Sequence, residues 1–235
     1  MAAPPRPPRL SIIIPTMNEE AGIGRTIELV HTALRPSGID YEVLVVDTDS
    51  KDRTREIAAS LGARVVDEPR RGYGRAYKTG FEQARGELIS TLDADATYPA
   101  ERIPELVRQL EAESLDFLTG NRFASLQKGA MSLKHRFGNW VLSTFLRLRF
   151  RLPIRDSQSG MWVFLRAALP RWELTADGME LSEEIKVEAF SKSRAREVPI
   201  EYRPRVGEAK LQSFSDGWRN LRFLMKKRVR RDAGR

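Results

Sequence analysis

Short, wholly apolar segments alternate along the first half of the chain with longer segments whose apolar residues recur at helical spacing. The apolar runs predict buried strands over residues 10–15, 41–46, 63–66, 87–92 and 116–119. The segments between them predict helices over residues 22–34, 50–61, 75–84 and 101–114. Strands that alternate with helices of this length are typical of a doubly wound, mostly parallel sheet flanked by helices. We therefore predict an α/β fold in which residues 10–212 form a single domain.

Acidic residues follow three of these predicted strands. Glu19 follows the first strand, Asp47 and Asp49 follow the second, and Asp93 and Asp95 follow the fourth. In doubly wound sheets, ligands bind beyond the carboxyl ends of the strands, where the strand order reverses. We therefore expect these acidic turns to lie together at one edge of the sheet.

The turn Asp93-Ala94-Asp95 places two carboxylates one residue apart at the end of an apolar run. Such a pair can bind one hard cation, and Mg²⁺ or Mn²⁺ held in this way completes its shell with phosphate oxygens of the substrate. Aspartate is also common in solvated turns, where it accepts local hydrogen bonds. The alternatives are therefore a metal-dependent enzyme that acts on a diphosphate and a purely structural turn.

Composition narrows the choice of metal. The chain has 235 residues, no cysteine and two histidines, His31 and His135. Zinc sites are built largely from cysteine and histidine, so this residue content favours a hard metal with oxygen ligands. With 41% hydrophobic residues, the chain has enough apolar content for one substantial core.

No apolar run approaches the roughly 20 residues that a membrane-spanning helix requires. The proline-rich segment over residues 1–9 contains no apolar stretch and predicts a disordered arm. We therefore expect a cytoplasmic protein that is soluble or bound peripherally at the cytoplasmic face of a membrane.

Charge is distributed unevenly along the chain. Residues 1–120 contain 15 Lys/Arg and 20 Asp/Glu, a net charge of −5, whereas residues 121–235 contain 25 and 12, a net charge of +13. The acidic half favours cation binding, and the basic half favours phosphates, nucleic acid or an anionic membrane surface. No nucleic-acid-binding motif accompanies the basic residues, so nucleic-acid binding is only the remote alternative.

Two segments of the basic half combine arginines with large apolar side chains. Residues 133–151 predict a helix whose large apolar side chains could face the core or a membrane interface. They include Phe137, Trp140, Val141, Phe145 and Leu148. Residues 213–235 predict a basic amphipathic helix or tail. This tail could lie on an anionic membrane, dock on a membrane partner protein, or form a disordered terminus.

Seven short segments, spread over roughly residues 11–211, carry a family resemblance. They are SIIIPTMNEE, VLVVDTDSKDRT, RRGYGRAYKTGF, LDADATYP, GNRF, RDSQSGMWVF and EVPIEYRPRVGEAKL. In this order they resemble the family 2 inverting glycosyltransferases, which have the GT-A fold, and among them the dolichyl- and polyprenyl-phosphate sugar synthases such as dolichol-phosphate mannosyltransferase. No single motif would carry this assignment, but their order and spacing do.

The resemblance implies a nucleotide-sugar donor of the GDP-mannose or UDP-glucose type, together with a Mg²⁺ or Mn²⁺ cofactor. It implies that Asp93 and Asp95 hold the metal and act in catalysis. The residues implied in nucleotide binding are Pro15, Met17, Glu19, Asp47, Asp49, Asp93, Ala94 and Asp95. For Asp47, a helix-capping or turn role is the alternative.

The resemblance also implies that a hexose is transferred to a dolichyl or polyprenyl phosphate. The residues implied in binding the acceptor or its phosphate are Arg122, Arg136, Ser159, Arg203, Arg205 and Lys210. Asp156 would shape the acceptor pocket and contribute to catalysis, or would instead anchor a neighbouring arginine. For each arginine taken alone, a solvated surface charge is the alternative.

Two positions depart from the family pattern. Thr97 stands where many relatives have a glutamine that binds the metal. Thr48-Asp49 stands where relatives often have aspartate followed by a small residue. The metal preference and the identity of the nucleotide are therefore left open.

The acceptor chemistry leaves a second functional hypothesis. A lipid phosphate is already an anion at neutral pH, so it needs an activating base less than a hydroxyl acceptor does. Glu183 and Glu184 fall where other family 2 enzymes place such a base, although an amphipathic helix capped by Ser182 is the alternative interpretation. The second hypothesis is therefore a family 2 enzyme with a soluble hydroxyl acceptor, either a metabolite or a glycan.

Overall fold

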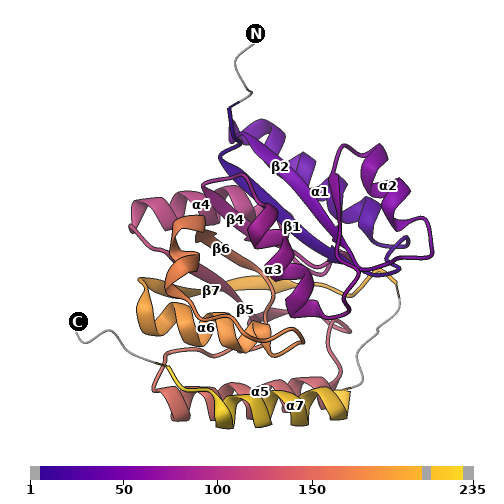
Figure 1. The fold of residues 1–235 in the computed structure, drawn as a ribbon. Helices are drawn as coiled ribbons and strands as arrows, with labels where there is room; N and C mark the ends of the chain where they lie inside the picture. Colours follow the sequence, from indigo (N-terminus) through magenta and orange to yellow (C-terminus); the bar gives the residue numbers. More distant parts are fainter. Residues whose placement is uncertain (1–5, 208–212, 230–235) are drawn as a thin grey trace.

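A seven-stranded sheet lies at the centre of residues 6–207 and 213–229, which the computed structural model describes (Figure 1). Its strand order is β3-β2-β1-β4-β6-β5-β7. The strands are β1 (Leu10–Thr16), β2 (Tyr41–Asp47), β3 (Arg64–Asp67), β4 (Leu88–Thr91), β5 (Phe117–Leu126), β6 (Trp162–Leu165) and β7 (Ala195–Tyr202). Strand β6 is antiparallel to β4 and β5, and the other pairs are parallel. The predicted mostly parallel α/β sheet is confirmed.

Helices cover both faces of the sheet because its strands carry apolar side chains on both sides. In β1, Ile12 and Ile14 join the apolar cluster on one face and Ile13 joins the cluster on the other, as the two-residue period of a strand requires. Helices α1 (Ile23–Leu34) and α4 (Ile103–Ala112) pack on the first face, and α3 (Tyr73–Gln83) and α6 (Leu181–Lys192) pack on the second. The short helix α2 (Thr54–Ser60) packs beside α1.

Helix α3 approaches the sheet most closely at Gly80. A side chain at this position would place its Cβ 2.5 Å from Cγ2 of Ile13, so glycine is required where α3 crosses β1. The close approach brings Tyr73, in the first turn of α3, to the acidic turn that follows β4.

Strand β5 is longer than the strand predicted over residues 116–119. It continues to Leu126 because its second half also pairs with β7, after a register shift between Asn121 and Ser125. Arg122 lies within this irregular stretch, and its backbone N–H donates a 3.0 Å hydrogen bond to a carboxylate oxygen of Asp156. The irregularity therefore lets a buried side chain, rather than a strand, satisfy this backbone group.

Helices α5 (Leu133–Phe150) and α7 (Ser213–Lys226) lie side by side at one end of the molecule, below the sheet in Figure 1. On its inward face, α5 contributes Leu142 and Leu146, and Leu146 packs with Val187 of α6 and Leu224 of α7. Its opposite face is exposed. Large apolar side chains on that face are Leu133, Phe137, Trp140 and Leu148. The core-facing interpretation is therefore wrong for Phe137, Trp140 and Leu148, whereas Phe145 packs against the buried cluster around Leu146.

Within the segment predicted as a basic amphipathic helix or tail, residues 213–226 form α7. Residues 230–235 and 208–212 lie outside the described residues, as do the first five residues of the predicted arm. None of the described helices combines the length and the low charge content that crossing a bilayer would require.

Helix α6 is buried along most of its length, although the sequence suggested an amphipathic helix capped by Ser182. The residue that precedes the helix is Glu180, and Ser182 lies inside it without capping it. Glu183, Glu184, Lys186 and Glu188 all belong to this helix, and each is fully buried. Buried charges are stable only when partners compensate them, so these side chains must be paired with other elements.

Lys227, just beyond α7, supplies one such partner. Its ammonium group donates hydrogen bonds to Glu184 Oε1 and to the carbonyl oxygen of Glu173, each at 2.8 Å, and forms an ion pair with Glu188 Oε1 at 2.9 Å. This ammonium group therefore ties the end of α7 to α6. We call this contact the Lys227 clasp.

Replacing Lys227 with methionine should destabilise the fold by about 3–5 kcal/mol, because it leaves the buried Glu184 carboxylate without its cation. The neighbouring Lys226 is exposed, so Lys226→Met is the matched control and should change stability by less than about 0.5 kcal/mol. Urea unfolding followed by fluorescence measures both changes. Equal unfolding midpoints for the two variants would show that the Lys227 clasp does not stabilise the protein.

Candidate active site

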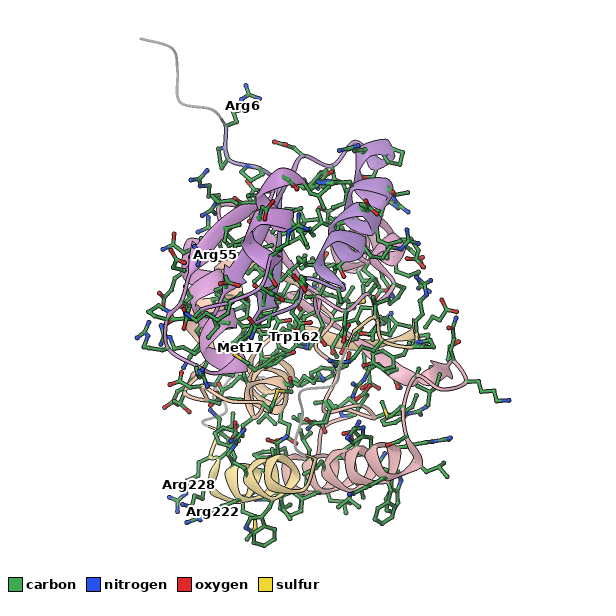
Figure 2. The ribbon with its side chains drawn as sticks, turned by 90° about the vertical axis from the view of Figure 1, so that its right-hand side faces the viewer. Arg6, Met17, Arg55, Trp162, Arg222 and Arg228 are labelled. Atoms are coloured by element: carbon green, nitrogen blue, oxygen red, sulfur yellow. The ribbon has the colours of Figure 1, made fainter. Side chains whose placement is uncertain are left out.

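A pocket of about 240 Å³ lies at the carboxyl ends of the parallel strands. Its wall is formed by the loops after β1, β2 and β4, by the start of α3, and by two later segments that contain Met179 and Arg205. The residues that line it are Pro15, Thr16, Met17, Glu19, Thr48, Gly72, Tyr73, Ala76, Asp93, Ala94, Asp95, Met179 and Arg205. Figure 2 shows Met17 between the sheet and the layer formed by α5 and α7. The acidic turns after β1 and β4 therefore meet in this pocket, as the topology predicted.

Asp47 lies beneath this pocket instead of lining it. Its buried carboxylate accepts hydrogen bonds from the hydroxyl of Thr16, at 2.9 Å, and from the backbone N–H of Ser50, at 3.0 Å. It thereby fixes the loops after β1 and β2 relative to each other. Asp49 is exposed and forms an ion pair with Lys51. Direct contacts of Asp47 and Asp49 with a nucleotide remain predictions.

Asp95 is held in place by the residues that follow it. Its Oδ1 accepts hydrogen bonds from the backbone N–H and the hydroxyl of Thr97, at 3.1 and 2.7 Å. Its Oδ2 lies 3.0 Å from the guanidinium of Arg205, and the backbone N–H of Val206 donates to the Asp95 carbonyl oxygen. Thr97, which replaces the glutamine of many relatives, therefore orients the aspartate.

Asp93 has an unusual protonation equilibrium because it lies beside Asp95. Burial and the neighbouring Asp95 carboxylate raise the pKa of Asp93, the charges of Arg205 and Arg122 oppose the rise, and the resulting pKa is about 7. The hydroxyl of Tyr73 lies 3.5 Å from its Oδ1. Two carboxylates that repel each other in this way favour binding of a positive ion.

Arg122 and Asp156 form a buried pair next to this centre. The Nε and Nη2 atoms of Arg122 bind the two carboxylate oxygens of Asp156 at 2.8 and 2.9 Å, and the guanidinium lies over the ring of Tyr202. The pKa of Asp156 is lowered; its burial opposes the change, and the charge and hydrogen bonds of Arg122 outweigh it. Lys186 donates to the carbonyl oxygens of Asp156 and Ser159 at 2.8 Å each. Asp156 therefore anchors an arginine, as one of the two interpretations proposed.

The other residues predicted to bind phosphate do not gather in the pocket. Arg136 lines a separate cavity with Arg147 and Arg155, and Arg203 forms ion pairs with Glu101 and Glu201. Ser159 is buried, and its hydroxyl has no hydrogen-bond partner within the described part of the chain. Lys210 lies outside the described residues. Arg205 is the one member of this predicted set that lines the pocket, and the roles of the others remain predictions.

The match to a family model decides the class of the protein. Residues 11–172 match the model of glycosyl transferase family 2. The chain belongs to this family. It is therefore a glycosyltransferase, and the pocket at the strand ends is its candidate active site.

Curated relatives of this glycosyltransferase cover most of the chain. It is 42% identical to a low-salt glycan biosynthesis hexosyltransferase of Haloferax volcanii over 93% of the chain and 53% of that protein, so it spans about half of that relative. It is 33% identical to the dolichyl-phosphate hexose transferase of the same organism, over 88% of the chain and 89% of that protein. The dolichol-phosphate mannosyltransferase of Pyrococcus furiosus is 31% identical over 93% of the chain and 64% of that protein.

A solved structure supports the GT-A fold. Glucosyl-3-phosphoglycerate synthase from Mycobacterium tuberculosis, in complex with Mn²⁺, UDP and glucosyl-3-phosphoglycerate, has a TM-score of 0.75 and 21% identity to this chain. The similarity covers 93% of this chain and 78% of that one. At this identity the similarity concerns the fold alone.

The acidic turn of this glycosyltransferase offers carboxylate oxygens, which are the kind of ligand that a hard divalent cation prefers. In residues 6–207 and 213–229, no group of three or more histidine or acidic side chains could surround a metal ion. Asp93 and Asp95 would therefore supply only part of a coordination shell. Mg²⁺ is commonly held by one or two carboxylates and completes its shell with water and phosphate oxygens. The repulsion between Asp93 and Asp95, which raises the pKa of Asp93, is consistent with a cation at this place.

Glu183 and Glu184 have different environments, although both fall where other family 2 enzymes place a base. Glu184 accepts hydrogen bonds from Thr175, Ala176 and Lys227, so its carboxylate is occupied by structural contacts. Glu183 accepts one hydrogen bond from Gln158, and its Oε2 atom has no partner in the described segments. Burial raises the pKa of Glu183 to about 8. Neither carboxyl lines the pocket that contains Asp93 and Asp95, and a role as base remains a prediction for both.

Six residues of the pocket wall were not among the site residues predicted from the sequence, namely Thr16, Thr48, Gly72, Tyr73, Ala76 and Met179. The sequence did contain a signal for Tyr73. The glycines on either side of it, Gly72 and Gly74, allow another backbone segment to approach closely. A Cβ at Gly74 would lie 2.6 Å from the Ala176 carbonyl oxygen. Met179 had no such signal, since it follows an irregular segment and reaches the pocket only through the fold.

Proposed function

We propose that this glycosyltransferase transfers a hexose from a nucleotide sugar to a dolichyl or polyprenyl phosphate, with Mg²⁺ or Mn²⁺ as cofactor. The observation that carries the proposal is the acidic turn, whose Asp93 and Asp95 meet Arg205 in a pocket at the strand ends. Relatives named as dolichyl-phosphate hexose and dolichol-phosphate mannosyl transferases support this choice of acceptor.

The donor would occupy the pocket with its nucleoside between the loops after β1 and β2. Pro15 and Met17 offer apolar surface, and Thr48 offers a hydroxyl. Asp93 and Asp95 would hold the metal, which when bound would neutralise charge on the departing nucleoside diphosphate. Thr97 would keep Asp95 in a fixed rotamer, so no reorganisation would be needed as the leaving group departs.

The acceptor phosphate would attack the anomeric carbon directly. A bond would form from a phosphate oxygen to that carbon while the bond to the diphosphate breaks, which inverts the configuration. The attacking oxygen is already anionic, so no proton must be removed. Arg205 would help to attract the two anionic substrates. Arg122, which Asp156 holds in place, would add positive electrostatic potential near Asp93.

The transfer of radioactive hexose to a short prenyl phosphate tests the proposal, with GDP-mannose and UDP-glucose as donors and Mn²⁺ present. The wild-type protein should form a labelled glycolipid. Asp95→Asn should lower the rate at least about a hundredfold, because it weakens binding of the metal that would neutralise the negative charge of the leaving group. The matched control is Asp67→Asn, since Asp67 is an exposed carboxylate paired with Arg55 away from the pocket, and it should keep wild-type activity.

The absence of glycolipid with every common donor would contradict a lipid phosphate acceptor. The second candidate, a soluble hydroxyl acceptor, is favoured by one observation, the buried Glu183 carboxyl with one unpartnered oxygen. Glu183→Gln separates the two candidates. A glutamine can still accept the hydrogen bond from Gln158 but cannot take a proton, so it should spare transfer to a phosphate and abolish transfer to a hydroxyl.

We also propose that the layer formed by α5 and α7 rests on an anionic membrane. Four apolar side chains of α5 form an exposed row, namely Leu133, Phe137, Trp140 and Leu148, with exposed fractions of 83%, 65%, 58% and 73%. On α7, Trp218 is 66% exposed. Figure 2 shows Arg222 and Arg228 beside α7, pointing away from the body of the molecule. Aromatic side chains flanked by arginines are typical of helices that lie in a membrane interface.

Vesicle flotation tests this surface. The double variant Phe137→Ser/Trp140→Ser should reduce binding to vesicles of phosphatidylcholine and phosphatidylserine at least about tenfold, because it removes two exposed aromatic side chains that would be buried in the membrane interface. Leucine at both positions is the matched control and should retain most of the binding. Equal binding by the serine and leucine variants would contradict the placement of this face on the membrane.

A further inference from the structure

A second cavity, of about 370 Å³, lies between α5 and α7. The side of α5 is formed by Phe137 and Leu142, and the side of α7 by Trp218 and Leu221. The lining is therefore predominantly apolar. We call this cavity the interhelical groove.

Two glycines face this groove from opposite helices. Gly138 belongs to α5 and Gly217 to α7, and both line the cavity. A Cβ built at either position would meet no atom within 4 Å. Glycine is unfavourable inside a helix, and close packing does not require it here. What the two glycines provide is width in the groove.

The inner end of the groove leads to the active site. Met179 lines both the groove and the pocket that contains Asp93 and Asp95. Beside it, Asn220 donates a 3.1 Å hydrogen bond to Gln158, which in turn donates to Glu183. The carbonyl oxygen of the Asn220 side chain is buried and has no hydrogen-bond partner among the described residues. A buried polar atom of this kind calls for a partner supplied by a ligand or by water.

The outer end of the groove opens onto the exposed apolar face of the helical layer. Phe137 and Trp218 belong to both, because each lines the groove and is largely exposed. An apolar path therefore runs from the proposed membrane face, between the two helices, to Met179 at the active site. A ligand that matches this path has a polar end toward the sheet and a hydrocarbon chain toward the membrane.

We propose that the interhelical groove holds the first isoprenoid units of the acceptor, next to its phosphate, and that Gly138 and Gly217 set its width. This inference rests on the proposed function, since it assigns a place to the lipid part of that acceptor. The groove extends from the active-site pocket to an apolar outer surface, which is the continuity that a lipid phosphate requires. Isoprenoid chains carry methyl branches, so a groove widened by two glycines suits them better than a narrow one would.

The experiment uses the whole chain with Gly138→Leu/Gly217→Leu, which fills the groove from both sides. Leucine is a strong helix former and no atom blocks its Cβ, so the variant should fold with an unchanged or higher melting temperature. The alanine pair, Gly138→Ala/Gly217→Ala, removes the same glycines but adds only one methyl group at each position. It is therefore the matched control.

Binding of geranylgeranyl phosphate, followed by tryptophan fluorescence, is measured first because it does not depend on transfer. The leucine pair should raise the dissociation constant at least about tenfold, and the alanine pair should change it less than about threefold. The KM for this acceptor in the transfer assay should rise in parallel, with the KM for the nucleotide sugar unchanged. A shorter acceptor, geranyl phosphate, should bind the wild-type protein more weakly, because fewer isoprenoid units occupy the groove.

Each outcome decides a different point. Wild-type affinity in the leucine pair overturns the groove assignment, and if transfer persists the proposed function stands. Binding that the leucine pair abolishes, without transfer from any donor, supports the groove and rejects the proposed function. A change of oligomeric state in the leucine pair, with prenyl phosphate affinity unaltered, would mean that a second copy of the chain occupies the groove, which also overturns the assignment.

Discussion

Two carboxylates held side by side at the end of β4 are the constraint on which the rest of the site depends. Asp93 and Asp95 follow a buried strand, so they cannot separate without disturbing the centre of the sheet. Burial and the neighbouring charge raise the pKa of Asp93 to about 7, and the guanidinium of Arg205 lies against Asp95. The turn therefore attracts positive charge, and the surrounding elements keep the two carboxylates together.

Helix α6 connects this centre to the helical layer formed by α5 and α7. Lys186 of α6 supports the loop that contains Asp156, and Asp156 in turn fixes Arg122. Glu184, from the same helix, receives Lys227 at the end of α7. The charges of α6 are thus divided between the side that faces the active site and the side that faces the helical layer. Their burial is stable because each side chain finds a partner from another element.

The first half of the fold could be predicted because its signals are local. Each apolar run forms a strand, and the acidic turns meet because parallel strands end at the same edge of the sheet. Strands β6 and β7 were not predicted, since their places depend on pairing with distant residues. The buried ion pairs of Arg122 and Glu184 could not be predicted either, because charged residues are usually exposed at the protein surface. Arg136 and Arg203 share motifs with pocket residues, yet the fold directs them to other partners.

The affinity for Mn²⁺ in the presence of UDP, measured against pH by electron paramagnetic resonance, tests the cation site most directly. At pH values below the Asp93 pKa of about 7, a metal ion must displace the proton that Asp93 carries. The affinity should therefore rise about tenfold per pH unit up to about pH 7 and level off at higher pH. In Asp93→Asn, only titration of the nucleotide can make the Mn²⁺ affinity depend on pH. The part of the pH dependence that comes from Asp93 should therefore be absent from this variant. An affinity that is independent of pH, or that is unchanged in Asp93→Asn, would contradict the account.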